Sequence, residues 1–286
     1  MRTHSTTRSL LIIVCWLLVN IHSTTASAED LELINRPVNT SGLTGLLFTT
    51  APYTLPKGKL EAGTAVLTET STIPHYTVSQ IPAVFISSGI AQDMELAIST
   101  RYLKKTTGDN LKARGAGDTE LTYKWNFLPQ RESSSMPSLA LLMAGTAPTG
   151  DRDLDLATVV HWGARLGLSA GTELLWGEHV LGIYADGQVV VHDLSDARYR
   201  DRYGLINAGL LLPISKYRNL QMFVEYSQVA GIDKINATGG DYTGITYGLR
   251  LVNERFNITF GTQFLHKAVT GFDNSKRIVG MMSLKL

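Results

Sequence analysis

Charged side chains recur at alternate positions of otherwise apolar segments, so that acids and bases could share one face. Paired charges on such a face would form a network that fills an interior, whereas separate charges would line a narrow polar passage that selects solutes. Neither use requires a catalytic residue. The candidates for this inward-facing, lumen-lining set are Glu61, Glu95, Arg101, Glu120, Lys124, Arg165, Glu225, Arg250 and Lys285.

Alternation with a period of two residues defines the elements that must position these charges. In residues 118–127, apolar and aromatic residues alternate with charged and polar ones, and residues 94–104 and 256–266 repeat the pattern. This alternation is typical of a β-strand with one polar and one apolar face. After residue 28 no apolar stretch is long enough for a transmembrane helix, and apolar residues do not recur at helical spacing.

The length and number of the alternating segments favour a membrane barrel over a soluble β-sandwich, whose strands also alternate. Most segments are longer than the usual strand of globular proteins, which has about 5–6 residues. Their length is close to that of a tilted membrane strand, which needs about 9–11 residues. We therefore expect an all-β fold, a transmembrane antiparallel up-and-down β-barrel of about 12 strands. The strands are predicted at 58–70, 78–89, 92–104, 117–128, 138–148, 156–170, 178–191, 200–213, 219–230, 242–252, 256–267 and 277–286.

The connections between these segments supply a second argument, because bacterial barrels have short periplasmic turns and longer outer loops. With a periplasmic N-terminus, the turns are predicted at 90–91, 129–137, 169–177, 214–218 and 253–255. The outer loops are predicted at 71–77, 105–116, 149–155, 192–199, 231–241 and 268–276. Most turns are shorter than the loops, and 129–137 is the exception.

The N-terminus has the order of a cleaved secretory signal peptide. Arg2 and Arg8 precede an apolar run from Leu10 to Ile21, and small residues follow as far as Ala28. An uncleaved anchor helix is the alternative, but the run is shorter than the about 20 residues that a spanning helix needs. We therefore expect 1–28 to be a signal peptide, 29–57 an N-terminal periplasmic or plug segment, and 58–286 the β-barrel.

The composition of the exported part excludes several classes of protein. Removal of Arg2 and Arg8 changes the formal net charge from +1 to −1, and the remaining charges are scattered singly. A nucleic-acid-binding protein would normally carry a basic patch, so no nucleic acid is expected as a partner. The one cysteine, Cys15, lies in the predicted signal peptide, which leaves no disulfide or thiol chemistry in the mature chain.

The remaining residue types do not form a recognisable catalytic or metal site. His161 is expected to point into the lumen beside Arg165, but no histidine lies in the His-x-Ser-Asn-Gly context of an outer-membrane lipid hydrolase. Asp151 and Asp153 could bind Ca²⁺, yet Arg152 between them opposes a cation. The sequence therefore predicts no enzyme, no metal and no cofactor.

The end of the chain provides a possible partner site. Residues Gly280 to Leu286 alternate and continue to the last residue, with Met282, Leu284 and Leu286 on one face. Such a strand resembles the C-terminal signal that the barrel-insertion machinery reads, although that signal normally ends in an aromatic residue. The expected partners are this machinery and the lipid of the outer membrane.

The region from Thr44 to Gly63 resembles the opening of two outer-membrane barrel families. It contains a Gly-Leu segment, a proline-containing turn and a Pro-x-Gly lead into the first strand. One is the transporter family associated with the meta-pathway of phenol degradation, and a weaker resemblance is to the exopolysaccharide-linked barrel family. Asp93 to Leu96 and Gly115 to Leu121 also resemble the first family. The resemblance implies an outer-membrane channel or transporter without catalytic residues.

Two functions follow from these expectations. The first is a channel or transporter for small hydrophilic or aromatic solutes, with residues 29–57 available as a plug. The second is a closed structural or envelope-assembly barrel whose loops or N-terminal segment bind a partner. A lipid hydrolase is a third alternative. A barrel of about 12 strands lies between the filled eight-stranded type and the wide porins, which favours a narrow or plugged lumen.

Overall fold

The computed structural model describes residues 34–71, 76–107, 112–130, 136–151, 156, 159, 161–176, 179–193, 202–214, 218–231, 241–267 and 274–286. The predicted signal peptide, residues 1–28, lies outside the described residues. The strands are β1 (Leu60–Ser71), β2 (Tyr76–Ala91), β3 (Met94–Thr107), β4 (Lys112–Ala116), β5 (Thr119–Leu128), β6 (Ser138–Ala147), β7 (Gly163–Trp176), β8 (His179–His192), β9 (Arg202–Pro213), β10 (Leu220–Gly231), β11 (Tyr242–Val252), β12 (Phe256–Lys267) and β13 (Ser275–Lys285).

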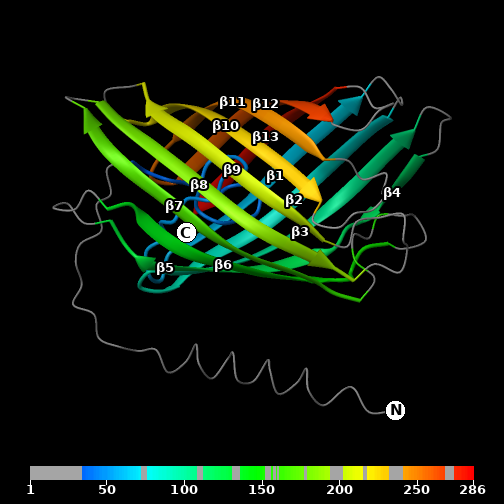
Figure 1. The fold of residues 1–286 in the computed structure, drawn as a ribbon, viewed down its shortest axis with the longest axis horizontal. Coiled ribbons are helices and arrows are strands. Elements are labelled where there is room, and N and C mark those ends of the chain that lie inside the picture. The colour runs from blue at the N-terminus through cyan, green and yellow to red at the C-terminus, as the bar shows by residue number, and fades with distance from the viewer. Residues whose placement is uncertain are drawn as a thin grey trace, which may run out of the picture. The chain divides into compact units, whose positions relative to one another are not determined.

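The strands form one closed antiparallel ring, because β1 pairs with both β2 and β13. The short β4 and the longer β5 both pair with β3, one after the other, so they form a single strand interrupted at Gly117 and Asp118. The 13 segments therefore make a closed 12-stranded barrel, as the sequence predicts. Figure 1 shows the tilted strands wound into this ring.

The alternation of residue types decides which side chains face outward. In β10, Met222 and Val224 are exposed, whereas Phe223 and Glu225, at the alternate positions, are buried. The outward face carries many large apolar side chains, among them Leu166 at 57% and Phe260 at 64% exposure. A soluble protein rarely exposes so continuous an apolar surface, whereas lipid is its natural environment. In the described part of the chain, no helix has the length and hydropathy needed to span a membrane.

Three predicted boundaries are wrong. The strand predicted from residue 156 begins at Gly163: Leu156 and Val159 are buried outside any strand, and the Asp118 carboxylate accepts a hydrogen bond from the Val159 N–H at 3.0 Å. The turn predicted at 169–177 is instead the second half of β7, paired with β8 as far as Trp176. The loop predicted at 105–116 is shorter, because β3 continues to Thr107 and β4 begins at Lys112.

The two ends of the barrel differ. We call the end at which β1 begins and β13 ends the turn end; there Asp93, with φ of 60°, makes a tight connection between β2 and β3. The opposite end, with the connections after β1, β3, β6, β8, β10 and β12, is the loop end.

Residues 34–57, here called the inner segment, lie within the ring of strands (Figure 1). Their backbone and side chains contact wall residues on strands that are far apart around the ring, including Glu95 of β3, Asp186 of β8 and Arg250 of β11. Ile34, Leu46 and Leu47 pack in a core cluster with wall residues such as Leu211 and Phe223. The wall of the barrel therefore surrounds the inner segment.

Candidate functional site

Two wall glutamates bind backbone N–H groups of the inner segment. Glu95 accepts hydrogen bonds from the N–H and hydroxyl of Thr44, each at 3.0 Å. Glu225 accepts from the N–H groups of Leu47 at 3.3 Å, Phe48 at 3.0 Å and Thr49 at 2.7 Å. A carboxylate accepts strong hydrogen bonds from N–H groups, so each glutamate fixes a turn of the inner segment that has no strand partner of its own.

A third acidic side chain holds the next residue. Asp186 accepts a hydrogen bond from the Thr50 N–H at 2.8 Å, and Ser169 donates to the Thr50 carbonyl at 2.5 Å. Asn207 and Gln188 donate to Asp186 in turn, at 3.1 Å and 2.6 Å. Both backbone groups of Thr50 are therefore bound by the wall.

Two buried cations bind the carbonyl groups of the same region. The Lys124 ammonium lies 2.7 Å from Glu95 and donates to the carbonyls of Thr44 and Ala51, each at 3.2 Å. Arg250 donates to the Gly45 carbonyl at 3.0 Å. A buried charge is tolerated where it is paired and hydrogen-bonded, and the inner segment supplies part of that pairing.

Further contacts fix the inner segment at the turn end. Arg36 lies 2.6 Å from Glu173 and 3.6 Å from the ring centre of Tyr53. Lys285 donates to the Asn35 side chain at 2.7 Å. Glu61 accepts from the Val38 N–H at 3.4 Å and from the hydroxyl of Ser283. The inner segment therefore contacts the wall from the turn end to the middle of the barrel.

Glycines in the wall make room for the inner segment. A Cβ atom at Gly209 would lie 2.3 Å from Leu46, and one at Gly261 would lie 2.7 Å from Leu47. Both distances are shorter than a normal non-bonded carbon–carbon contact, so a larger residue would displace the leucine or the strand. Gly42, whose carbonyl accepts a hydrogen bond from the Ser87 hydroxyl, has φ of 85°, which favours glycine.

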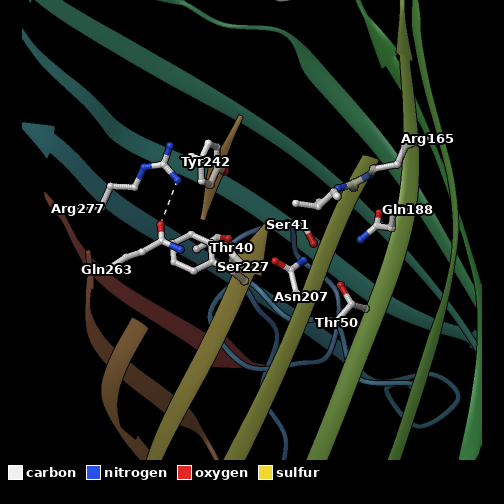
Figure 2. A pocket seen from close by; sticks show the side chains of 12 residues that line it. Thr40, Ser41, Thr50, Arg165, Gln188, Asn207, Ser227, Tyr242, Gln263 and Arg277 are labelled. Atoms are coloured by element: carbon white, nitrogen blue, oxygen red, sulfur yellow. Dashed lines mark hydrogen bonds between the residues drawn. The ribbon is translucent and has the colours of Figure 1, made fainter. Parts of the chain in front are cut away.

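The loop half of the lumen contains a polar cavity of about 370 Å³, and a second one of about 170 Å³ adjoins it. Thr40, Ser41 and Phe48 of the inner segment line both cavities, so this segment forms their floor. Figure 2 shows Arg165 on one side of the smaller cavity and Arg277, beside Tyr242 and Gln263, on the other.

Three arginines and two glutamates face the larger cavity. Arg165 lies 2.6 Å from Glu120, and Arg277 lies 2.8 Å from Glu69 and donates to Gln263 at 3.1 Å. The Arg101 guanidinium forms no ion pair or hydrogen bond with any residue that the structure describes. Among the described residues, the cavity wall therefore carries one more positive than negative charge.

The structure places the predicted lumen residues in three groups. Glu95, Lys124, Glu225 and Arg250 are buried against the inner segment, and Glu61 and Lys285 contact its first residues near the turn end. Arg101, Glu120 and Arg165 line the larger cavity.

Sequence reasoning missed four charged residues of the lumen: Glu69, Glu173, Asp186 and Arg277. Alternation could have found three of them. Glu69 lies at the same alternate position in β1 as Glu61, Arg277 at the same alternate position in β13 as Lys285, and Asp186 at the same alternate position in β8 as Gln188. The same reasoning could not find Glu173, because that residue falls where a turn is predicted.

One further expectation needs correction. His161 does not point into the lumen beside Arg165; its side chain is 70% exposed and lies 2.9 Å from Asp193 in the connection between strands. In the described residues, no group of three or more histidine, cysteine, aspartate and glutamate side chains could hold a metal ion.

Comparison with known proteins supports the fold. No protein-family model matches the sequence, and no curated protein matches it. An outer membrane channel from Pseudomonas putida F1 superposes with a TM-score of 0.62 at 12% identity, covering 82% of this chain and 98% of that one. The NanC porin superposes with a TM-score of 0.50 at 9% identity, covering 78% of this chain and all of that one, 100%. At these identities the likeness shows that the chain has the fold of outer-membrane barrels.

Proposed function

We propose that this protein is an outer-membrane channel for small solutes whose inner segment closes the turn half of the lumen. The observation that carries the proposal is the polar cavity inside a closed transmembrane barrel, with the inner segment as its floor. Two proteins with the same fold, a channel and a porin by name, support the proposal. A signal peptide on residues 1–28 would export the chain, and the turn end would face the periplasm.

Conduction requires that the inner segment move or loosen, because it occupies the lumen between the cavity and the turn end. Hydrogen bonds and packing hold this segment to the wall, and among the described residues the isolated bridge between Lys57 and Gly89 is the one strand-like pairing that joins it to the ring. Such contacts can be exchanged without opening the barrel. The closed ring therefore serves as a frame within which a separate element gates the path.

Insertion of the barrel would depend on its last strand. β13 pairs with β1 along its length and places Met282 and Leu284 on the exposed, lipid-facing side. The residues from Gly280 to Leu286 are the part of the chain that we propose the barrel-insertion machinery binds.

A closed structural barrel is the second candidate, because the inner segment is buried and its backbone groups are largely bound by the wall. In that case the cavity at the loop end, or the first residues of the inner segment, would bind an envelope partner. The same experiment separates the two candidates.

The test is single-channel recording in planar bilayers on the refolded protein and on a variant in which residues 37–55 are replaced by a Gly/Ser sequence of equal length. Heat modifiability on a gel verifies that both barrels are closed. We expect discrete conductance steps from the native chain and larger, steadier steps from the variant. Silence of the folded native chain at all voltages would contradict the channel and favour the structural barrel.

A further inference from the structure

In the part of the chain that the structure describes, the lining of the larger cavity has an excess of positive charge that its own glutamates do not neutralise. Its three arginines come from β3, β7 and β13, and its two glutamates, Glu69 and Glu120, each already pair with one arginine. Charges inside the lumen are screened less than charges on an open surface, so one surplus arginine raises the affinity for an anion.

The arginines also retain unused hydrogen-bond donors. A guanidinium has five N–H groups; in the described residues Arg165 donates through Nη2 to Glu120, and the Arg101 side chain has no hydrogen-bond or ion-pair partner. Arginine binds the oxygens of carboxylate and phosphate groups through two parallel hydrogen bonds. Arg101 and Arg165 can therefore bind an oxyanion without breaking the ion pairs present.

The remaining lining suits a small organic anion. Hydroxyl groups of Thr40, Ser41 and Tyr203 can bind polar substituents, and Phe48 and Leu205 offer apolar contact. The volume of about 370 Å³ falls within the range of about 300–1,000 Å³ typical of small-molecule sites.

We infer that the cavity is a binding site for small organic oxyanions, carried by Arg101 and Arg165 with Arg277 on the opposite side. The inference deepens the proposed channel function by naming the solute class, and it rests on that function only for the transport step. Since Thr40 and Ser41 belong to the inner segment, a bound anion contacts the same element that closes the turn half.

The test is isothermal titration calorimetry on the full-length protein in detergent micelles at low salt. The probes are citrate and inorganic phosphate, with glycerol as the neutral control. We expect saturable binding of at least one anion and none of glycerol. Arg101→Gln should weaken the binding about ten-fold, the change expected from the loss of one charge-assisted hydrogen bond. The matched control is Arg114→Gln, which removes the same charge from an exposed position of β4 and should change the affinity less than about two-fold.

A second variant acts in the opposite direction. Glu120→Gln removes the partner of Arg165 and should tighten binding several-fold, so a folding defect of Arg101→Gln cannot hide the result. Heat modifiability verifies each barrel. Absence of anion binding, or an affinity that Arg101→Gln and Arg114→Gln change equally, would overturn the inference. Calorimetry in micelles does not depend on conduction, so the two proposals can fail separately. A barrel that binds citrate but shows no conductance would contradict only the channel function. A barrel that conducts but binds neither anion would contradict only the anion-binding site.

Discussion

The two halves of the lumen use the same kind of wall for different purposes. In the turn half, Glu95, Asp186 and Glu225 bind N–H groups of the inner segment, and the space is filled. In the loop half, arginines outnumber glutamates, and the wall leaves a cavity. Alternation directs charged side chains inward in both halves. The two halves differ because the inner segment binds these charges in the turn half and leaves them facing a cavity in the loop half.

Two ion pairs, one in each half of the lumen, show this difference. Lys124 and Glu95 lie 2.7 Å apart with both side chains 0% exposed, whereas Arg165 and Glu120 lie 2.6 Å apart with 17% and 16% exposure. Their geometry is alike, so a difference in their contribution to stability must come from burial and from the inner segment. The following predictions test this, from the largest expected effect to the smallest.

Lys124→Met should have the largest effect, a loss of about 3–5 kcal/mol, because it leaves the Glu95 carboxylate buried without its partner. The measurement is the free energy of unfolding of the protein in lipid vesicles, obtained from a urea titration that tryptophan fluorescence monitors. The double variant Lys124→Met with Glu95→Gln is the control and should recover part of the loss. A single variant as stable as the native chain would show that this pair does not hold the inner segment.

Glu225→Ala should cost about 1–3 kcal/mol, because the N–H groups of Leu47, Phe48 and Thr49 lose their acceptor inside the barrel. The same urea titration measures the effect. Glu225→Gln should cost less, since the amide oxygen can still accept. An equal effect of both variants would mean that the lost packing of the side chain, and not the hydrogen bonds, determines the stability.

Gly209→Ala should cost about 1–3 kcal/mol, because the new methyl group would lie 2.3 Å from Leu46. The measurement is the temperature at which half of the protein has changed from the folded to the unfolded band on a gel. Gly187→Ala, where a Cβ meets no atom within 4 Å, is the matched control and should leave the midpoint unchanged. If the two substitutions behave alike, the close packing of the inner segment against β9 is not present in solution.

Arg165→Gln should have the smallest effect on unfolding, about 0–1 kcal/mol, because its pair with Glu120 is partly exposed to the cavity. Urea titration at low and high salt checks the value, and high salt should reduce the difference further. A loss as large as that of Lys124→Met would remove the distinction between the two halves of the lumen.

Much of the barrel can be predicted from the sequence, because apolar and polar residues alternate along the strands. The segments 256–267 and 242–252 are predicted with the observed bounds. The start of the strand predicted at 156–170 is wrong because Leu156 and Val159 are buried outside a strand, where Asp118 accepts a hydrogen bond from the Val159 N–H, and hydrophobicity alone does not distinguish this burial from a strand. The alternation of residues in the strand also predicts that Glu225 points inward.

The partners of the inward charges cannot be predicted in the same way. Glu225 binds backbone groups of residues about 177 positions earlier in the chain, and backbone N–H groups carry no signature of residue type. The same limit applies to Gly209, whose role depends on Leu46 across the lumen. Only the folded arrangement shows which inward charges are bound by the inner segment and which face the cavity.

Hydrogen–deuterium exchange of the folded native protein tests the central claim most directly. We predict that the N–H groups of Thr44 and of Leu47 to Thr50 exchange as slowly as those of β10 and β11, since wall carboxylates bind them inside the barrel. Complete exchange of these N–H groups within seconds, while the strands stay protected, would mean that the inner segment is not bound in the lumen and would contradict the account.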